Sequence, residues 1–132
     1  MSGDERLVEN LERMLETASQ TLIYVEGLDF ETFQGDDILQ KAVAMNLLLI
    51  GEASSRLLRI APNWSQLHPA TPWQLITGMR NRIAHDYSSL NVLTVWNMVQ
   101  ESLPELCWDV KRILKSLLDK YDPPKTAPTP DS

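Results

Sequence analysis

A stretch of ten residues, 78–87, carries most of the side chains in this sequence that could do chemistry. It holds two arginines, an amide, a histidine, a carboxylate and a phenol, with apolar sequence on both sides. A guanidinium can hold a phosphate through two parallel hydrogen bonds and stabilise charge as it develops. Histidine can take or give a proton near neutral pH. Together they favour phosphodiester cleavage without a metal ion, since on RNA the 2′-hydroxyl supplies the nucleophile.

Three residues of this stretch are candidates for catalysis. Arg80 would hold the scissile phosphate, His85 would assist the proton transfer, and Asn81 would orient one of them. Arg82 and Asp86 are four residues apart and share a helical face, so Arg82 could bind RNA or pair with Asp86. The alternative interpretation makes Arg82–Asp86 a surface pair and His85 a cap beside the negative end of the helix dipole.

The spacing of Arg80 and His85 is a geometric problem. They are five residues apart, which on a regular helix separates their directions by about 140°. Either the helix ends before His85 and the chain swings it round, or the two residues meet across a two-fold axis from different chains. The second route requires a dimer.

Other chemistries have little support in the sequence. There are only two histidines, His68 and His85, and no cluster with metal-ligand spacing, so no metal or other cofactor is expected. A nucleophile motif with a histidine base is absent, as is a glycine-rich phosphate loop. The stretch holds no pair of carboxylates, which gives glycosidase chemistry no basis.

The charge distribution is uneven. The net charge of −6 argues against broad binding of nucleic acid. Residues 53–85, however, contain four arginines and both histidines but no carboxylate, and this basic island could receive an anion locally. The alternative is chance clustering on solvated faces. A single cysteine, no apolar run near the roughly 20 residues of a membrane span, and an acidic N-terminus without a signal peptide together predict a cytoplasmic protein.

Apolar spacing predicts an all-α fold, an antiparallel four-helix bundle with a short additional helical segment. Helices are expected over residues 4–25, from 36 or 37 to 58, from a capping box at 71–74 to about 85, and over 92–102. A second capping box at 102–105 would restart a last helix that runs to 121, with Pro104 ending or kinking the one before. Residues 60–70 are expected to form a loop, Phe30 and Phe33 to fold back on the core, and residues 122–132 to be a proline-rich disordered tail.

The second of these helices is apolar over much of its circumference. Its expected stripe is widened by Leu47, Leu48 and Ile50, and its members are Ile38, Ala42, Met45, Leu49, Ala53 and Leu57. That pattern is typical of a central helix, or of one covered partly by a second copy of the chain. Gly51 is small enough to permit close approach of another helix. Glu52 needs a partner if it is buried, with Arg80 and Arg82 as candidates, or else it lies on an exposed face.

The sequence Arg80-Asn-Arg-Ile-Ala-His85-Asp-Tyr87 resembles the signature of the HEPN superfamily, in which four residues separate an arginine from a histidine. The added tyrosine two residues after the histidine is specific to the HepT-like branch, the toxins of HepT/MNT toxin–antitoxin pairs. Gly51-Glu-Ala53 and the segment 73–87 resemble that branch as well. The resemblance extends over roughly residues 5–121 and identifies residues 1–121 as one helical domain.

The resemblance implies a homodimer whose two motifs face each other in a cleft. It implies metal-independent RNA cleavage with Arg80 and His85 as catalytic residues and Asn81 beside them. It also implies a partner, a minimal nucleotidyltransferase (MNT) antitoxin, which transfers AMP from ATP onto Tyr87. The alternative function is a catalytically silent helical dimer that serves as binding partner and AMP acceptor of such an enzyme.

Overall fold

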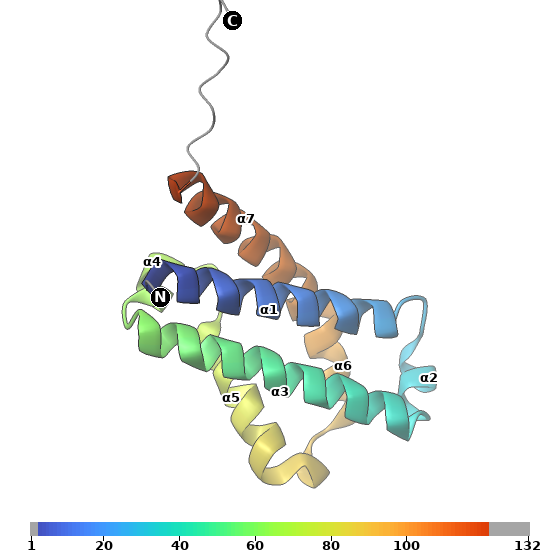
Figure 1. The fold of residues 1–132 in the computed structure, drawn as a ribbon. Helices are drawn as coiled ribbons and strands as arrows, with labels where there is room; N and C mark the ends of the chain where they lie inside the picture. Colours follow the sequence, from blue (N-terminus) through green and yellow to red (C-terminus); the bar gives the residue numbers. More distant parts are fainter. Residues whose placement is uncertain (1–2, 122–132) are drawn as a thin grey trace, which may run out of the picture.

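The computed structural model describes residues 3–121, and within that range it contains helices and turns and no strand (Figure 1). The prediction of an all-α fold is confirmed. The elements in chain order are α1 (Gly3–Tyr24), α2 (Phe30–Gln34), α3 (Asp37–Ile60), α4 (Trp64–Leu67), α5 (Trp73–Asp86), a 3-10 turn (Tyr87–Ser89), α6 (Val92–Asn97), a π-helix (Met98–Ser102) and α7 (Leu103–Tyr121). The proline-rich tail predicted for residues 122–132 lies outside the described residues.

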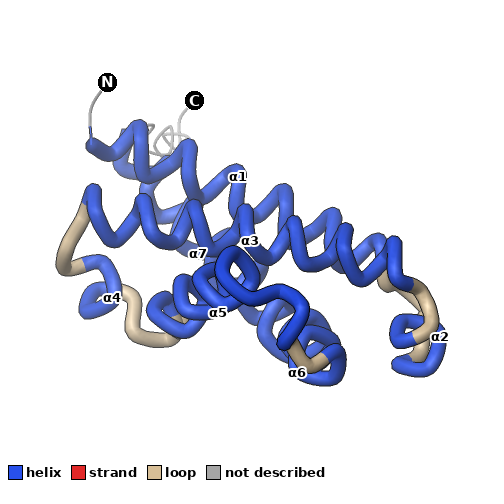
Figure 2. Tube along the Cα trace, turned by 90° about the horizontal axis from the view of Figure 1, so that it is seen from below, coloured by secondary structure: helices blue, strands red, loops and turns tan. Residues whose placement is uncertain are grey.

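Helix α3 lies at the centre of the fold. It runs antiparallel beside α1, while α5 and α7 cross this pair, as Figures 1 and 2 show from two directions. It packs against both α1 and α5, and α7 packs against α1. The arrangement therefore departs from a regular bundle of four parallel or antiparallel helices. Helix α3 contacts α1 on one side and α5 on another.

The apolar stripe predicted for α3 is wrong in part. Three of its members, Ile38, Met45 and Leu49, are 81%, 55% and 47% exposed. The buried face instead includes Val43 and Leu47, together with Ile50, Ala53 and Leu57. Because α3 is apolar nearly all round, spacing alone could not decide which side faces the core. The consequence is a row of large apolar side chains on the surface.

The start of α5 also differs from the prediction. The capping box at residues 71–74 does not form, and the helix begins at Trp73 without a side-chain cap. The Thr71 hydroxyl donates to Asp109 Oδ2 at 2.8 Å instead, which ties this end of α5 to α7. The indole of Trp73 donates to the backbone oxygen of His68 at 2.9 Å. The loop expected over residues 60–70 contains the short helix α4.

Residues 92–121 form one continuous helical run, although a restart at residues 102–105 was predicted. Pro104 has no N–H to donate, and its ring crowds the backbone oxygen four residues earlier. The π-helix just before it widens the turn, so that the N–H of Leu103 reaches back to Met98. The prediction that Phe30 and Phe33 fold back on the core is confirmed: Phe33 is fully buried and Phe30 is half-buried, and their rings lie 5.2 Å and 6.2 Å from that of Trp96.

Candidate active site

The site is built where α3 and α5 are in close contact. A Cβ placed on Gly51 of α3 would lie 2.2 Å from the Cβ of Arg80 on α5, far inside contact distance. The absence of a side chain at Gly51 is therefore what allows the base of Arg80 to rest on the α3 backbone, as its small size predicted. Nearby, Ser54 donates to the backbone oxygen of Trp73 at 3.1 Å, which fixes the two helices against each other.

Arg80 is held between two neighbours. Its Nε donates to Glu52 Oε1 at 2.7 Å, and one terminal nitrogen is paired with the same oxygen. The other terminal nitrogen donates to Asn81 Oδ1 at 3.0 Å. The side chains of Arg80 and Glu52 are 30% and 26% exposed, so the pair lies at the surface but is partly shielded from water. Of the two partners considered for Glu52, the structure places Arg80 there.

This arrangement leaves part of the guanidinium available. A guanidinium has five N–H groups. Three are directed at Glu52 and Asn81, so each terminal nitrogen of Arg80 keeps one hydrogen for an incoming anion. The amide N–H groups of Asn81, which is exposed, lie beside them. The two remaining N–H groups could donate to an anion, and the bonds to Glu52 fix the orientation of the guanidinium.

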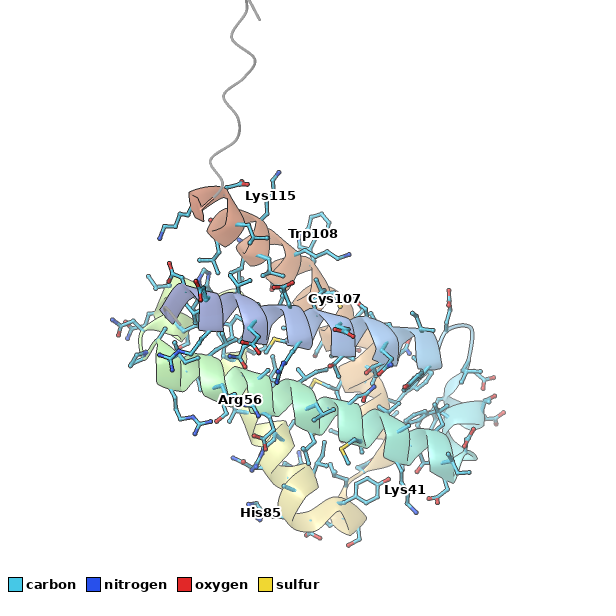
Figure 3. All side chains as sticks on the ribbon, in the orientation of Figure 1. Lys41, Arg56, His85, Cys107, Trp108 and Lys115 are labelled. Atoms are coloured by element: carbon cyan, nitrogen blue, oxygen red, sulfur yellow. The ribbon has the colours of Figure 1, made fainter. Side chains whose placement is uncertain are left out.

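His85 does not meet Arg80 within one chain. Helix α5 runs unbroken to Asp86, so the route in which the helix ends before His85 is excluded. The five-residue spacing on this continuous helix directs the two side chains about 140° apart. Figure 3 shows His85 on the outer side of α5, where it is exposed. Within residues 3–121 the imidazole has no hydrogen-bond partner, and it is free to act on a group from outside the chain.

Arg82 and Asp86 remain apart. No ion pair joins Arg82 to Asp86 or to Glu52 in the described part of the chain, and both Arg82 and Asp86 are exposed. A carboxylate oxygen of Asp86 accepts from the Ser88 hydroxyl at 3.4 Å. The proposed surface pair is therefore absent, and Arg82 presents an unpaired charge next to Asn81.

Tyr87 lies directly after the end of α5, two residues beyond His85. It begins the 3-10 turn, is half-buried, and lines a pocket of about 160 Å³ whose polar members include Asp37 and Gln40. Lys41 pairs with Asp37 at 3.0 Å. The hydrogen bond to Asp37 is the main cause that raises the pKa of Lys41, and the phenol of Tyr87 adds a smaller electrostatic contribution. The tyrosine thus has both space and a lysine cation in its surroundings.

The second histidine lies elsewhere. The ring of His68 is 4.2 Å from that of Trp64, and burial, followed by the charge of Arg112, lowers its pKa. Among residues 3–121, no three His, Cys, Asp or Glu side chains gather closely enough to hold a metal ion. Within the same range, no helix combines the length and apolar character that crossing a membrane requires.

Comparison with known proteins agrees with the motif. The family described as "Ribonuclease HepT-like" matches residues 6–113. "Putative RNase TTE0752" of Caldanaerobacter subterraneus subsp. tengcongensis is 33% identical over 105 residues, which cover 80% of this chain and 91% of that protein. "Probable ribonuclease HepT" of Thermococcus cleftensis is 33% identical over 93 residues, 70% of this chain and 81% of that protein. No solved structure matches significantly. The chain belongs to the ribonuclease HepT-like family.

Proposed function

We propose that this chain is a metal-independent endoribonuclease whose site combines Arg80 and Asn81 of one chain with His85 of a second chain. The observation that carries the proposal is the fixed guanidinium of Arg80, bonded to Glu52 at 2.7 Å with two N–H groups left for a phosphate. In the reaction the RNA 2′-oxygen attacks phosphorus while the bond from phosphorus to the 5′-oxygen breaks. The guanidinium stabilises the negative charge that develops on phosphate, and His85 transfers a proton to or from the reacting oxygens.

The exposed row on α3 supports a homodimer. Ile38, Met45 and Leu49 recur at spacings of seven and four, so they lie on one face of the helix, and Glu52 continues that face by one more turn. Exposed apolar side chains gathered on one face are typical of an interaction surface. An isologous contact along this row would bring the Arg80–Glu52 pair of one chain toward the partner. A second α5, with its own His85, would then lie beside the first.

RNA cleavage in EDTA tests the catalytic part. Wild-type protein should cut RNA, whereas Arg80→Ala and His85→Ala should each lower the rate by at least about a hundredfold, the range of a lost charge stabiliser or proton-transfer group. His68→Gln is the matched histidine control, because His68 lies against Trp64 and away from the site. Wild-type protein that leaves RNA as intact as the two alanine variants do would refute nuclease activity.

Mixing the two inactive variants tests whether the site is shared. A mixed dimer of Arg80→Ala and His85→Ala chains contains one intact pair, Arg80 from one chain and His85 from the other. Random mixing should therefore restore about a quarter of wild-type activity, because half of the dimers are mixed and one of their two sites is intact. A site formed within one chain predicts no recovery at all.

We further propose that the chain is the toxin of a toxin–antitoxin pair, and that a minimal nucleotidyltransferase antitoxin neutralises it by adding AMP to Tyr87. The support is the motif tyrosine two residues after His85 and the pocket of about 160 Å³ that it lines. An added AMP group would place negative charge and bulk two residues from His85, where they would hinder the approach of RNA phosphate. After co-expression with the nucleotidyltransferase, intact mass should show AMP on wild-type protein and none on Tyr87→Phe. Adducts that persist in Tyr87→Phe would contradict the assignment.

One observation favours a second candidate, a silent dimer that only accepts AMP. Glu52 already neutralises Arg80, which weakens its attraction for phosphate. This candidate predicts AMP addition at Tyr87 together with RNA that stays intact in EDTA and with added Mg²⁺. The RNA assay and the mass measurement therefore separate the two functions.

A further inference from the structure

A second basic feature lies outside the Arg80 site. An open groove of about 530 Å³ runs between the first half of α1 and the last turns of α3. Four arginines line it, two from each helix: Arg6, Arg13, Arg56 and Arg59. About 45 residues of sequence separate the two pairs, and the antiparallel packing of α1 on α3 joins them.

The groove carries an excess of positive charge. Its one lining carboxylate, Glu9, pairs with Arg13 at 3.1 Å. The other three arginine side chains make no hydrogen bond or ion pair with any residue of the described range. Four arginines and one glutamate give the groove a net charge of +3, in a protein whose net charge is −6. Like charges collected in a concave surface focus the local potential and attract anions.

The groove adjoins the candidate site. Arg56 lies four residues after Glu52 on α3, so it occupies the same face one turn further on, about 6 Å along the helix axis. Arg59 extends the basic surface by another turn. An anionic chain whose phosphate is held by Arg80 would therefore meet Arg56 and Arg59 next.

We propose that this groove binds the phosphates of the RNA strand on one side of the bond that is cut. The inference rests on the proposed ribonuclease function and adds to it a surface that holds the substrate beyond the reacting phosphate. Arginine contacts to phosphate hold a strand without reading its sequence. A local tract of this kind lets an acidic protein bind RNA while the rest of its surface repels it.

Binding of oligoribonucleotides of two lengths tests the proposal. Fluorescence polarisation is measured on His85→Ala protein, which keeps the groove and does not cut the probe. A strand of 16 nucleotides should bind more tightly than a dinucleotide, because the single phosphate of the dinucleotide is held by Arg80 and none is left to reach the groove. Adding Arg56→Gln and Arg59→Gln should weaken binding of the longer strand and leave the shorter one nearly unchanged.

Salt dependence supplies the magnitude. Each phosphate contact to a single strand contributes about 0.7 to the slope of log affinity against log salt. Loss of two contacts should lower the slope by about 1.4. When salt rises from 50 to 200 mM, the Kd for the longer strand should increase for both proteins. The factor of increase should be about seven times larger for His85→Ala protein than for the same protein with Arg56→Gln and Arg59→Gln added.

A matched control removes two positive charges elsewhere. In Figure 3, Arg56 lies on α3 and Lys115 on α7, with α1 between them. Lys111 and Lys115 are both exposed on α7, so Lys111→Gln with Lys115→Gln makes the same change in net charge away from the groove. This control should leave the slope and the length dependence intact. Equal effects of the two double variants, equal affinity for both lengths, or no measurable binding would each overturn the proposal.

The outcome is separable from that of the proposed function. Binding through the groove without any RNA cleavage by wild-type protein would uphold the surface and refute the nuclease. Cleavage that depends on His85, together with an RNA affinity that Arg56→Gln and Arg59→Gln do not change, would uphold the nuclease activity and refute RNA binding by the groove. In the expected case, Arg56→Gln with Arg59→Gln raises KM for long RNA, whereas kcat/KM for a dinucleotide is unchanged.

Discussion

Substitution of Gly51 by alanine tests the contact on which the Arg80 site is built. The new Cβ would lie 2.2 Å from Arg80 Cβ, 3.0 Å from its Cγ and 3.1 Å from the backbone oxygen of Ile76. Carbon atoms in contact normally lie about 3.5–4.0 Å apart, so α3 and α5 must separate by more than about 1 Å. That shift moves the guanidinium relative to Glu52, which holds it at 2.7 Å.

Substitution by alanine should change the free energy of unfolding in opposite directions at Gly51 and at Gly78. Overpacking costs about 1–3 kcal/mol, and replacing glycine by alanine inside a helix returns about 1 kcal/mol. Gly51→Ala should therefore lower the free energy of unfolding by up to about 2 kcal/mol. At Gly78, inside α5, a Cβ would meet nothing within 4 Å. Gly78→Ala, the matched control, should raise stability by about 1 kcal/mol.

Urea denaturation followed by circular dichroism, at one protein concentration for all variants, measures this difference. The two variants should lie on opposite sides of the wild type, about 1–3 kcal/mol apart. RNA cleavage by Gly51→Ala should fall about a hundredfold, the scale of a 1 Å misplacement at a reacting centre. Equal stabilities for the two alanine variants, or full activity in Gly51→Ala, would show that the close approach does not position Arg80.

Three further substitutions have defined outcomes. Glu52→Gln removes the carboxylate that orients Arg80, so kcat for RNA should fall about tenfold or more while the fold persists in circular dichroism; unchanged kcat would remove the positioning role. Met45→Arg places a charge in the exposed row of α3 and should convert a dimer to a monomer by light scattering, whereas Leu118→Arg, at a site 49% exposed on α7, should leave the dimer intact. The pKa of His68 is lowered by burial from its ordinary value of 6.5, so the unfolded chain takes up the proton first as pH falls. The free energy of unfolding should therefore decrease below about pH 6.5, and less so in His68→Gln; identical pH profiles would contradict this.

The sequence predicted features that depend on local chemistry. Helical spacing located the long elements to within a few residues, and the small size of Gly51 indicated a close helix contact, although not that Arg80 makes it. Glu52 was recognised as a carboxylate in need of a partner, because it interrupts an apolar segment. Each of these inferences uses residues within one or two turns of each other, where backbone geometry fixes what shares a face.

What escaped prediction depends on packing between distant segments. Nothing in the sequence links Arg6 and Arg13 to Arg56 and Arg59, because only the register of α1 against α3 unites them. The exposed side of α3 was misassigned for the same reason, since both of its faces are apolar. The hydroxyl of Thr71 had two good partners, the start of α5 and Asp109, and only the position of α7 decided between them.

The unbroken course of α5 through His85 has a consequence for the amount of protein that a cell can tolerate. A single chain would hold only half of the proposed site, so under that proposal a newly made molecule would be inactive until it met another. While monomers predominate, the number of complete sites grows with the square of chain concentration. Dilution or slow synthesis would then keep the activity silent without any inhibitor, and a modest rise in expression would be enough to release it.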